Sequence, residues 1–593
     1  MRIRYAALLT VVTTLAALAG SSLGPAGAQA VGDQAFGGYG SGAAISLEVL
    51  QLGQTQTLNV QSAAAGQSTN SQGLPNDGIF NELGYIVQAQ GVGDRNSYGR
   101  GTGLELGLLT PTPNPDPNQL LLAGLAEAAA PPNSGLVEKQ IGPIKLGGVA
   151  YANLLRGQAA ARFDPNICVI GRPMSFGSGE AAGLQLLGTD PGGQLPLLSP
   201  VVGAGLPVDS TDPRNVSRTR SVTYLIPNGD GTFGVVSETR QTIAPVSLLG
   251  GAITLELLGE WALRAIATGK PDDPNTPAPN DGARVEYAPV GAGPTTPVAT
   301  LTVGASTPLE ITTQDLFGPT GFSLPLAPLA TATIGTPARA LGGAVGSAPV
   351  LAADGTAASA AVDVVQLSVL DIPLVLTGLD LRIGHMEALA VAPPGGVVCN
   401  IPVDKIGQPD PVQVGQDFTI TIRIPSDAAV FQELFGCDLI NISAVDVHTV
   451  ESGDARFILT GASNGGQISA DGTTVTFQNL GNYRIGDPPL ELTVTGRIPG
   501  NSGAGRLKDV ATVSATLGNC TGTGTGDDIV GEAIGRIGNT GVVGSFTLSG
   551  PQVSGGKLAA TGIDQSWPVL GGGALLLGAM GLRRRLRRPA RTG

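Results

Sequence analysis

The chain has 593 residues, of which 89 are glycine and 44 proline, while charged residues make up 13% and aromatic residues 4%. The glycines follow no three-residue period, which excludes collagen, and a hydrophobic content of 42% is too high for a disordered chain. A formal charge of −13 disfavours a nucleic-acid partner. Many short strands separated by glycine and proline turns fit this composition.

Residues 1–30 are typical of a secretory signal peptide. Arg2 and Arg4 precede an apolar run over residues 5–18, and small residues then lead to an A-x-A sequence at Ala28 and Ala30. The apolar run is shorter than the roughly 20 residues that span a bilayer, so cleavage after Ala30 is favoured over a retained membrane anchor. We therefore expect an exported protein.

Residues 31–395 are predicted to form a β-rich ectodomain. Its clearest hairpin joins strands at 221–226 and 234–240 through a glycine-containing turn. Residues 119–130 are the best helix candidate, although a glycine in the middle weakens it. The proline-rich segment near 271–282 is either a boundary between two subdomains or an exposed loop. The residues leave that choice open.

Residues 396–548 are predicted to form an Ig-like β-sandwich, because six strand-like runs occur within about 120 residues. The runs are 417–424, 439–450, 456–460, 473–479, 490–498 and 510–516. Through residues 414–419, 476–481 and 509–513, this part resembles the Ig-like domains that are common in bacterial surface proteins. That resemblance implies a spacer or structural role.

The four cysteines are Cys168, Cys399, Cys437 and Cys520. An even number in an exported chain predicts two disulfides, and none of the four belongs to a C-x-x-C motif of a zinc or redox site. Four cysteines allow three pairings. Counting strands up and down the sandwich favours Cys399–Cys437, which leaves Cys168 to pair with Cys520.

The larger N-terminal part also resembles a known group. Residues 37–50, 70–74, 96–103 and 166–171 are similar to the actinobacterial choice-of-anchor G surface proteins, and the likeness extends roughly over residues 35–540. Members of that group share an ectodomain and differ in their C-terminal anchors. The resemblance implies no catalytic residues.

The C-terminal segment has three parts in a fixed order. A pentapeptide comes first, followed by an apolar run over residues 567–582 and a cluster of arginines over 583–588. The pentapeptide consists of Leu558, Ala559, Ala560, Thr561 and Gly562. The apolar run is marginal as a permanent span, and the arginines favour a cytoplasmic end.

This arrangement resembles the cell-wall sorting signal of Gram-positive surface proteins, in the L-A-x-T-G form that class E sortases of actinobacteria recognise. It implies that a sortase cuts between Thr561 and Gly562 and joins Thr561 to peptidoglycan. Residues 549–561 would then be a spacer that carries the pentapeptide, and 562–593 a removed membrane-stalling tail. Loss of both ends removes eight basic residues and one acidic residue, so the charge of −13 becomes −20.

No residue pattern indicates catalysis, and we expect no cofactor and no metal ion. His385 is interpreted as a structural histidine and His448 as a surface position, neither with a ligand spacing around it. The G-x-S-x-G letters at 461–465 lack the helix that a nucleophile elbow requires. Loops at 114–118, 228–231 and 272–281 hold oxygen ligands but no EF-hand spacing, so ordinary turns are favoured. A Lys–Asn isopeptide bond is a hypothesis for the sandwich, with Lys405 and Lys508 as candidates.

The sequence thus predicts a non-enzymatic surface protein that is anchored covalently to the cell wall. Its expected partners are a sortase, for which it is a substrate, and peptidoglycan. The ectodomain would be structural or adhesive, with an unidentified ligand. Two alternatives stay open: a wall-anchored hydrolase of wall or extracellular polymer, and a single-pass membrane protein whose tail is never cut.

Overall fold

The structure is a computed structural model. It describes residues 34–49, 57–74, 79–80, 86–87, 95–109, 120–146, 150–186, 202–204, 215–248, 251–273, 282–293, 295–316, 322–326, 330–335, 338–341, 347–369, 379–520, 536–538 and 542–549. Within these residues the chain is built mainly of antiparallel strands, and its helices are the short segments α2 (Thr313–Leu316) and α3 (Ala428–Leu434). The prediction of a mainly β protein is confirmed.

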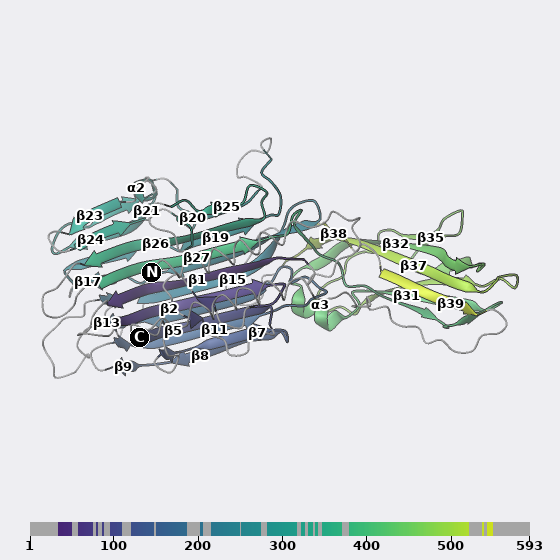
Figure 1. The fold of residues 1–593 in the computed structure, drawn as a ribbon, viewed down its shortest axis with the longest axis horizontal. Helices are drawn as coiled ribbons and strands as arrows, with labels where there is room; N and C mark the ends of the chain where they lie inside the picture. The colour runs from purple at the N-terminus through teal and green to yellow at the C-terminus, as the bar shows by residue number, and fades with distance from the viewer. Residues whose placement is uncertain are drawn as a thin grey trace, which may run out of the picture.

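The first sheet combines the beginning of the described chain with strands from far along it. Its order is β23 (Phe322–Leu326), β24 (Ala330–Ile334), β26 (Ala357–Val369), β27 (Leu379–Val391), β1 (Gly37–Val49), β2 (Thr57–Asn70), β5 (Ser97–Leu109) and β6 (Leu120–Ala123), with β25 (Val350–Leu351) on β26 and β7 (Ala126–Ala130) on β5. Because β1 pairs with β27, strands from the beginning and the end of the large region lie next to each other in one sheet (Figure 1).

The second sheet packs against the first. Its order is β20 (Arg284–Pro289), β19 (Trp261–Ala267), β16 (Thr232–Thr242), β15 (Val216–Pro227), β12 (Ser175–Ala182), β11 (Leu154–Ala161) and β8 (Ser134–Ile141), with β28 (Val397–Val398) on β16. Side chains of β16 donate hydrogen bonds to carbonyl oxygens of the first sheet, namely Ser237 to Tyr39 at 2.6 Å and Gln241 to His385 at 2.7 Å.

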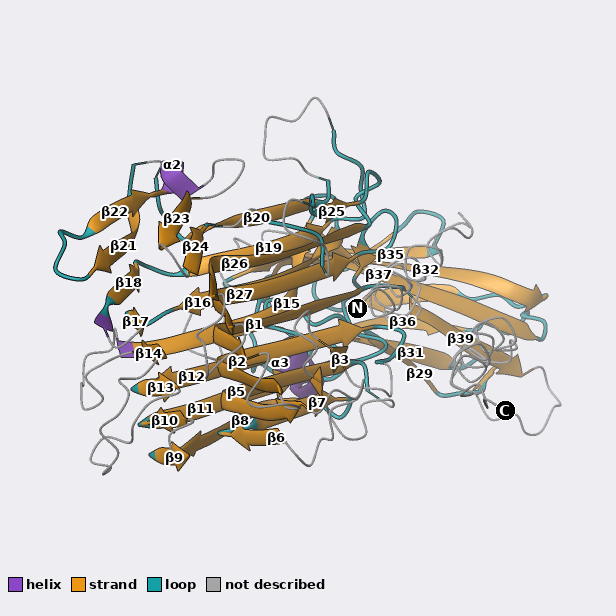
Figure 2. Ribbon diagram, turned by 60° about the vertical axis from the view of Figure 1, so that its left-hand side comes forward, coloured by secondary structure: helices purple, strands orange, loops and turns teal. Residues whose placement is uncertain are grey.

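The third sheet continues the second. Its order is β22 (Leu309–Thr312), β21 (Pro297–Val303), β18 (Ile253–Leu257), β17 (Val246–Leu248), β14 (Val202–Ala204), β13 (Leu184–Leu186), β10 (Ala150–Ala152) and β9 (Ile144–Leu146). Most of its strands are joined by a few residues to a strand of the second sheet, as β13 is to β12 through Gly183, which has a positive φ of 61°. Figure 2 shows the short strands β13 and β10 next to the longer strands β12 and β11. A small separate sheet pairs β3 (Ile79–Phe80) with β4 (Ile86–Val87).

Glycine lets the first two sheets approach each other closely. A Cβ atom on Gly101 of β5 would lie 1.9 Å from the carbonyl oxygen of Ser178 on β12, and one on Gly99 would lie 1.9 Å from that of Phe176. Buried hydroxyl and amide groups fill much of the remaining space: Thr223 donates to Gln67 at 2.6 Å, for example. The high glycine content therefore serves sheet packing as well as turns.

The C-terminal part is a two-sheet sandwich that extends beyond the large region along the long axis of the molecule (Figure 1). One sheet has the order β29 (Asp404–Gln408), β31 (Asp417–Ile424), β36 (Leu490–Arg497) and β33 (Ile458–Ala462). The other has the order β30 (Val412–Gln413), β39 (Val542–Ser549), β37 (Gly505–Gly518), β32 (Asp438–Gly453), β35 (Thr474–Phe477) and β34 (Gln467–Ile468), with β38 (Arg536–Gly538) on β37.

This topology agrees with the predicted Ig-like sandwich. In chain order β29, β31, β33 and β36 correspond to the A, B, D and E strands of one Ig sheet, and β32, β37 and β39 to the C, F and G strands of the other. The short strands β34 and β35 are an addition on the C-strand side. Alternate residues of β31, from Phe418 to Ile424, are buried in the core.

The predicted helix over 119–130 is wrong. The segment forms β6 and β7, and Gly124 between them has a φ of 72° that a helix interior excludes. Ala126, Ala128 and Ala130 are buried while Leu121 is exposed, so strand pairing and the packing of one face override local helix propensity. The predicted hairpin at 221–240 is confirmed as β15 and β16. The proline-rich segment near 271–282 joins β19 to β20, which are hydrogen-bonded neighbours in one sheet, and this favours a loop over a subdomain boundary.

Candidate functional sites

The export and sorting sequences lie outside the described residues. This applies to Ala28, Ala30 and all five residues of the pentapeptide. The last described strand, β39, ends at Ser549, shortly before Leu558. Among the described residues, no helix has the length and apolar character needed to cross a membrane.

All four cysteines form disulfides, but the favoured pairing is wrong. The structure pairs Cys168 with Cys399 and Cys437 with Cys520. Cys437 directly precedes β32 and Cys520 follows β37, and the register of these antiparallel neighbours places Asp438 opposite Gly518. The two cysteines therefore lie at the same end of the sandwich. The strand count failed because it treated Cys520 as lying at the opposite pole.

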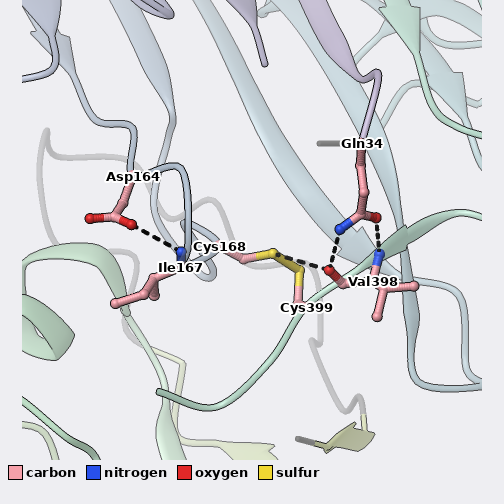
Figure 3. Close-up of a disulfide and its surroundings, with 6 residues drawn as sticks. All are labelled: Gln34, Asp164, Ile167, Cys168, Val398 and Cys399. Carbon is pink, nitrogen blue, oxygen red and sulfur yellow. Dashed lines mark hydrogen bonds between the residues drawn. A yellow bond between two sulfur atoms is a disulfide. The ribbon is translucent and has the colours of Figure 1, made fainter. Parts of the chain in front are cut away.

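The Cys168–Cys399 disulfide ties the large region to the segment that enters the sandwich (Figure 3). Next to it, the side-chain amide of Gln34 accepts a hydrogen bond from the backbone N–H of Val398 at 2.7 Å and donates one to its carbonyl oxygen at 2.8 Å. The beginning of the described chain, the second sheet and the connecting segment are thus fastened together at one point.

The sandwich is also joined to the large region through its backbone. Ile170 donates to the carbonyl oxygen of Leu434 at 3.1 Å, and Gly436 donates to that of Ile170 at 2.7 Å. The Arg172 side chain donates to the carbonyl oxygen of Phe435 at 3.0 Å. A Cβ atom on Gly171 would lie 2.6 Å from Sγ of Cys437, so the second disulfide borders the same joint. These contacts give the two parts a fixed connection.

His385 is at the centre of a buried charge cluster in the first sheet. Its Nδ1 lies 2.7 Å from Oδ1 of Asp363 on β26, and its Nε2 lies 3.2 Å from Oε1 of Glu387. The Arg339 guanidinium pairs with the other oxygen of Asp363 at 3.0 Å. Burial disfavours a charged ring, but the negative charge of Asp363 and the hydrogen bonds to both acids outweigh it and raise the pKa of His385 to about 9.

Within the described part of the chain, the His385 cluster is closed to solvent. The side chains of His385, Asp363 and Glu387 are each about 1% exposed. The nearby hydroxyl of Ser41 donates to Glu387 at 2.7 Å, so it makes its hydrogen bond to the acid and does not form a Ser-His pair. The interpretation of His385 as a hydrogen-bonded structural residue agrees with this geometry.

A second buried cluster lies inside the sandwich, and it contradicts the interpretation of His448 as a surface position. Nε2 of His448 lies 3.2 Å from Oδ2 of Asp446, and its Nδ1 lies 3.2 Å from Oδ1 of Asp509. Asp446 and His448 are on β32, and Asp509 lies directly opposite His448 on β37. The predicted alternation along β32 is confirmed, but the face that carries His448 is buried and not exposed.

Lys405 reaches this cluster from the other sheet. It is on β29, its side chain is 1% exposed, and its Nζ donates a hydrogen bond to Oδ1 of Asp446 and contacts Oδ1 of Asp509. Lys405 was one of the two lysines considered for an isopeptide bond. Its neighbours here are aspartates and not an asparagine.

The pKa values of the two aspartates of the cluster are shifted in opposite directions. Burial would raise the pKa of Asp446, but the His448 ring and the charge of Lys405 outweigh it and hold that pKa well below its usual value. Burial raises the pKa of Asp509 well above its usual value against the attraction of Lys405, and the negative charge of Asp446 adds to the increase. Of the two acids, Asp509 therefore holds a proton more strongly than Asp446.

The spacing of Asp446, His448 and Asp509 meets the geometric requirement for a metal ion, since one ligand atom of each lies within 4.8 Å of the others. The sequence offered no such spacing, because the three residues come together only when β32 pairs with β37. Here the Lys405 ammonium group supplies positive charge against both carboxylates. A metal ion would have to displace it.

Two other sequence patterns are turns, as predicted. Ser463, in the G-x-S-x-G letters, lies between β33 and β34, and its hydroxyl accepts a hydrogen bond from the N–H of Thr493 at 2.8 Å. Asp230, in the loop at 228–231, accepts from Thr232 and pairs with Lys270, which lowers its pKa to about 2 despite partial burial. Residues 114–118 and 274–281 lie outside the described residues.

No family model matches the chain, and no curated protein matches it in sequence. Among solved structures, AvmM, described as catalysing macrocyclization in alchivemycin A biosynthesis, is 15% identical over 26% of this chain and 92% of its own, with a TM-score of 0.14. The N-terminal domain of a Streptococcus gordonii adhesin is 8% identical over 85% and 91%, with a TM-score of 0.17. A Corynebacterium diphtheriae protein described as membrane-anchored is 11% identical over 87% and 98%, with a TM-score of 0.14. At such TM-scores these likenesses carry no argument.

Proposed function

We propose that the protein is exported, that a sortase joins it covalently to the cell wall, and that its β-ectodomain acts as a structural or adhesive module at the surface. The observation that carries this proposal is the C-terminal order of pentapeptide, apolar run and arginine cluster in a chain that begins with a signal-peptide pattern. Five loosely specified residues alone would be weak support.

The disulfides are consistent with export. All four cysteines are paired, and structural disulfides of this kind persist in oxidising compartments and are rare in the cytosol. In chain order the sandwich lies between the large region and the sorting sequence. A chain attached at Thr561 would therefore hold the sandwich next to the wall and present the large region beyond it.

The proposed attachment is an acyl transfer in which Thr561 is the substrate residue. A sortase cysteine thiolate attacks the Thr561 carbonyl carbon, and the peptide bond to Gly562 breaks. The Gly562 nitrogen takes a proton and leaves with the tail. An amine of the peptidoglycan precursor then attacks the thioester, releases the cysteine and forms a new amide bond.

Fractionation of the host envelope tests this proposal. The mature protein should be released by muramidase and should resist extraction by detergent. Thr561→Ala should abolish release as a muramidase-dependent species, because the sortase can no longer form its acyl-enzyme. Ser554→Ala, a similar truncation just before the pentapeptide, is the matched control and should behave like the unaltered protein. Complete extraction of the unaltered protein by detergent would instead identify a membrane anchor.

The structural or adhesive role is tested separately. The envelope-released protein, applied to glycan arrays and to arrays of extracellular proteins, should bind a defined ligand if the large region is adhesive. Absence of binding across both arrays would favour a structural coat component. Turnover of wall or extracellular polymer by the same preparation would contradict the non-enzymatic assignment.

A further inference from the structure

The hydrophobic pattern of β32 is locally inverted. Val445 and Val447 face outward and are 38% and 37% exposed, while Asp446 and His448 between and beside them point into the sandwich. Exposing valines while burying an acid and an imidazole opposes the usual sheet pattern. Such a departure from local consistency is expected at functional positions.

The buried groups are arranged around one amine. Lys405 extends from the four-stranded sheet, whereas Asp446 and Asp509 are on adjacent strands of the facing sheet. Nζ of Lys405 touches a carboxylate oxygen of each, and all three side chains are at most 1% exposed. A nucleophile, an electrophilic carbon and a proton acceptor are thus held together away from water.

We propose that Lys405 and Asp509 become joined by an intramolecular amide bond, with Asp446 as the catalytic proton acceptor. The bond would link β29 to β37 and therefore fasten the two sheets of the sandwich to each other. This modification concerns the sandwich alone, and it does not depend on how the chain is attached to the wall.

The protonation of the two acids assigns their roles. Asp509, whose pKa is raised and whose Oδ1 contacts Nζ of Lys405, is the acid that more readily carries a proton, and its neutral form can be attacked at Cγ. Asp446, whose pKa is lowered, is a carboxylate and can take a proton from the Lys405 ammonium group, with which it is hydrogen-bonded. His448 contacts both acids and holds them in position.

The reaction balances without any added reagent. Lys405 transfers one proton to Asp446 and becomes a neutral amine. Its nitrogen attacks Cγ of Asp509, and the N–C bond forms as the C–OH bond breaks. The hydroxyl group takes the second proton of the nitrogen and leaves as water. The products are one amide, one water molecule and a protonated Asp446, with no change in total charge. Burial favours the amide because bulk water has little access to it and so hydrolysis is slow.

Peptide mass spectrometry of the protein as isolated from its host tests the proposal. After reduction, alkylation and proteolysis, one branched peptide should contain both Lys405 and Asp509. Its mass should equal the two linear peptides less one water molecule. This readout is unaffected by processing at either end of the chain. Recovery of both peptides only in linear form would overturn the proposal.

Variants separate this bond from other links. Lys405→Arg keeps the positive charge but should lose the branched peptide, while Lys508→Arg, on the strand that carries Asp509, is the matched control and should retain it.

Asp509→Asn should give the same branched product as the unaltered protein, because ammonia leaves in place of water. Asp446→Asn should reduce branching strongly. A branched peptide that persists in Lys405→Arg, or full branching in Asp446→Asn, would contradict the assigned roles.

Discussion

Each of the two parts of this molecule buries a histidine between two acids, but the cation that balances them differs. In the large region His385 lies between Asp363 and Glu387, and the nearby cation is Arg339. In the sandwich His448 lies between two aspartates, and the cation is Lys405. Guanidinium groups stay protonated in proteins, whereas a buried lysine can lose its proton and act as a nucleophile. Similar electrostatics therefore give a permanent ion cluster in one part and a potential reaction centre in the other.

Besides an apolar core that includes Trp261 and Phe233, the large region has a second kind of packing. Glycine backbones and small hydroxyl side chains separate the first and second sheets of the large region, as at Gly101 and Thr223. The sandwich is filled by larger apolar side chains such as Phe418, Ile420 and Leu492. A glycine interface offers little freedom to adjust, whereas an apolar core can repack. Substitutions should therefore have different costs in the two parts.

The largest effect is expected where the two sheets of the large region touch. Gly101→Ala should lower the free energy of unfolding by at least about 3 kcal/mol, because its Cβ would overlap a backbone oxygen that belongs to the opposite sheet. Gly135→Ala on β8 is the matched control, since nothing lies within 4 Å of its Cβ position, and it should change stability by less than about 0.5 kcal/mol. Urea unfolding followed by circular dichroism measures both. Equal stabilities would mean that the sheets do not approach so closely.

Removing each disulfide in turn compares how much the joint and the sandwich contribute to the free energy of unfolding. Replacing both cysteines of either pair by serine should cost about 2–5 kcal/mol. The loss should be larger for Cys168–Cys399, which spans 231 residues, than for Cys437–Cys520, which spans 83. The chain-entropy model gives a difference of about 1 kcal/mol. Denaturant unfolding of the two double variants measures it, and the reverse order would show that the joint is not closed by the first pair in solution.

The His385 cluster should make stability depend on pH. The folded pKa of about 9 lies above the usual histidine value of 6.5, so this contribution is fully present below pH 6.5 and is lost as the pH rises through 9. The expected loss is about 3 kcal/mol. Asp363 and Glu387 stay ionised over this range, since their pKa values are lowered. Chemical unfolding at a series of pH values measures the slope.

His385→Gln is the control for that slope. It keeps a polar side chain in the cluster but cannot be protonated, so the loss of stability between pH 6.5 and 9 should disappear. A slope that is unchanged in the variant would assign the titration to another group. The ring should then be treated as neutral in the folded protein.

The smallest effect is expected on the outer face of β32. Val447→Thr should change the free energy of unfolding by less than about 0.5 kcal/mol, because the side chain is solvent-exposed. The same change at Val475 on the neighbouring strand β35, which is fully buried, should cost about 1–3 kcal/mol because a hydroxyl enters the core. Thermal unfolding of the two variants compares them. Similar losses would contradict the inverted orientation of β32.

Local sequence determined the fold class and most strands of the sandwich. The run over 417–424 coincides with β31, and the other five predicted runs each overlap a strand from β32 to β37. Period-two alternation and turn glycines are local signals, so they can be recognised without knowledge of the tertiary structure. The helix predicted at 119–130 is wrong because the alanines of this segment also fit a strand with one buried face.

The candidate sites were less predictable. The four cysteines could be recognised as disulfide partners, but not their pairing, which depends on strand neighbours. The sequence drew attention to Lys405, yet Asp446 and Asp509 looked like two of many acidic residues. The pattern Val-Asp-Val-His on β32 was a signal, since an alternating strand must bury one of its faces. Nothing local indicated that the charged face was the buried one.

The sequence by itself determined the β class of this protein and its even set of cysteines, and residues 558–588 carry the local pattern from which sorting is proposed. Only the tertiary structure decided which cysteines pair, which face of β32 is buried and which acids surround each histidine. These depend on strands far apart in the chain, such as β29 and β37, that meet when the sheets pack. A lysine that the sequence singled out and an aspartate that it did not then come into contact where water is excluded.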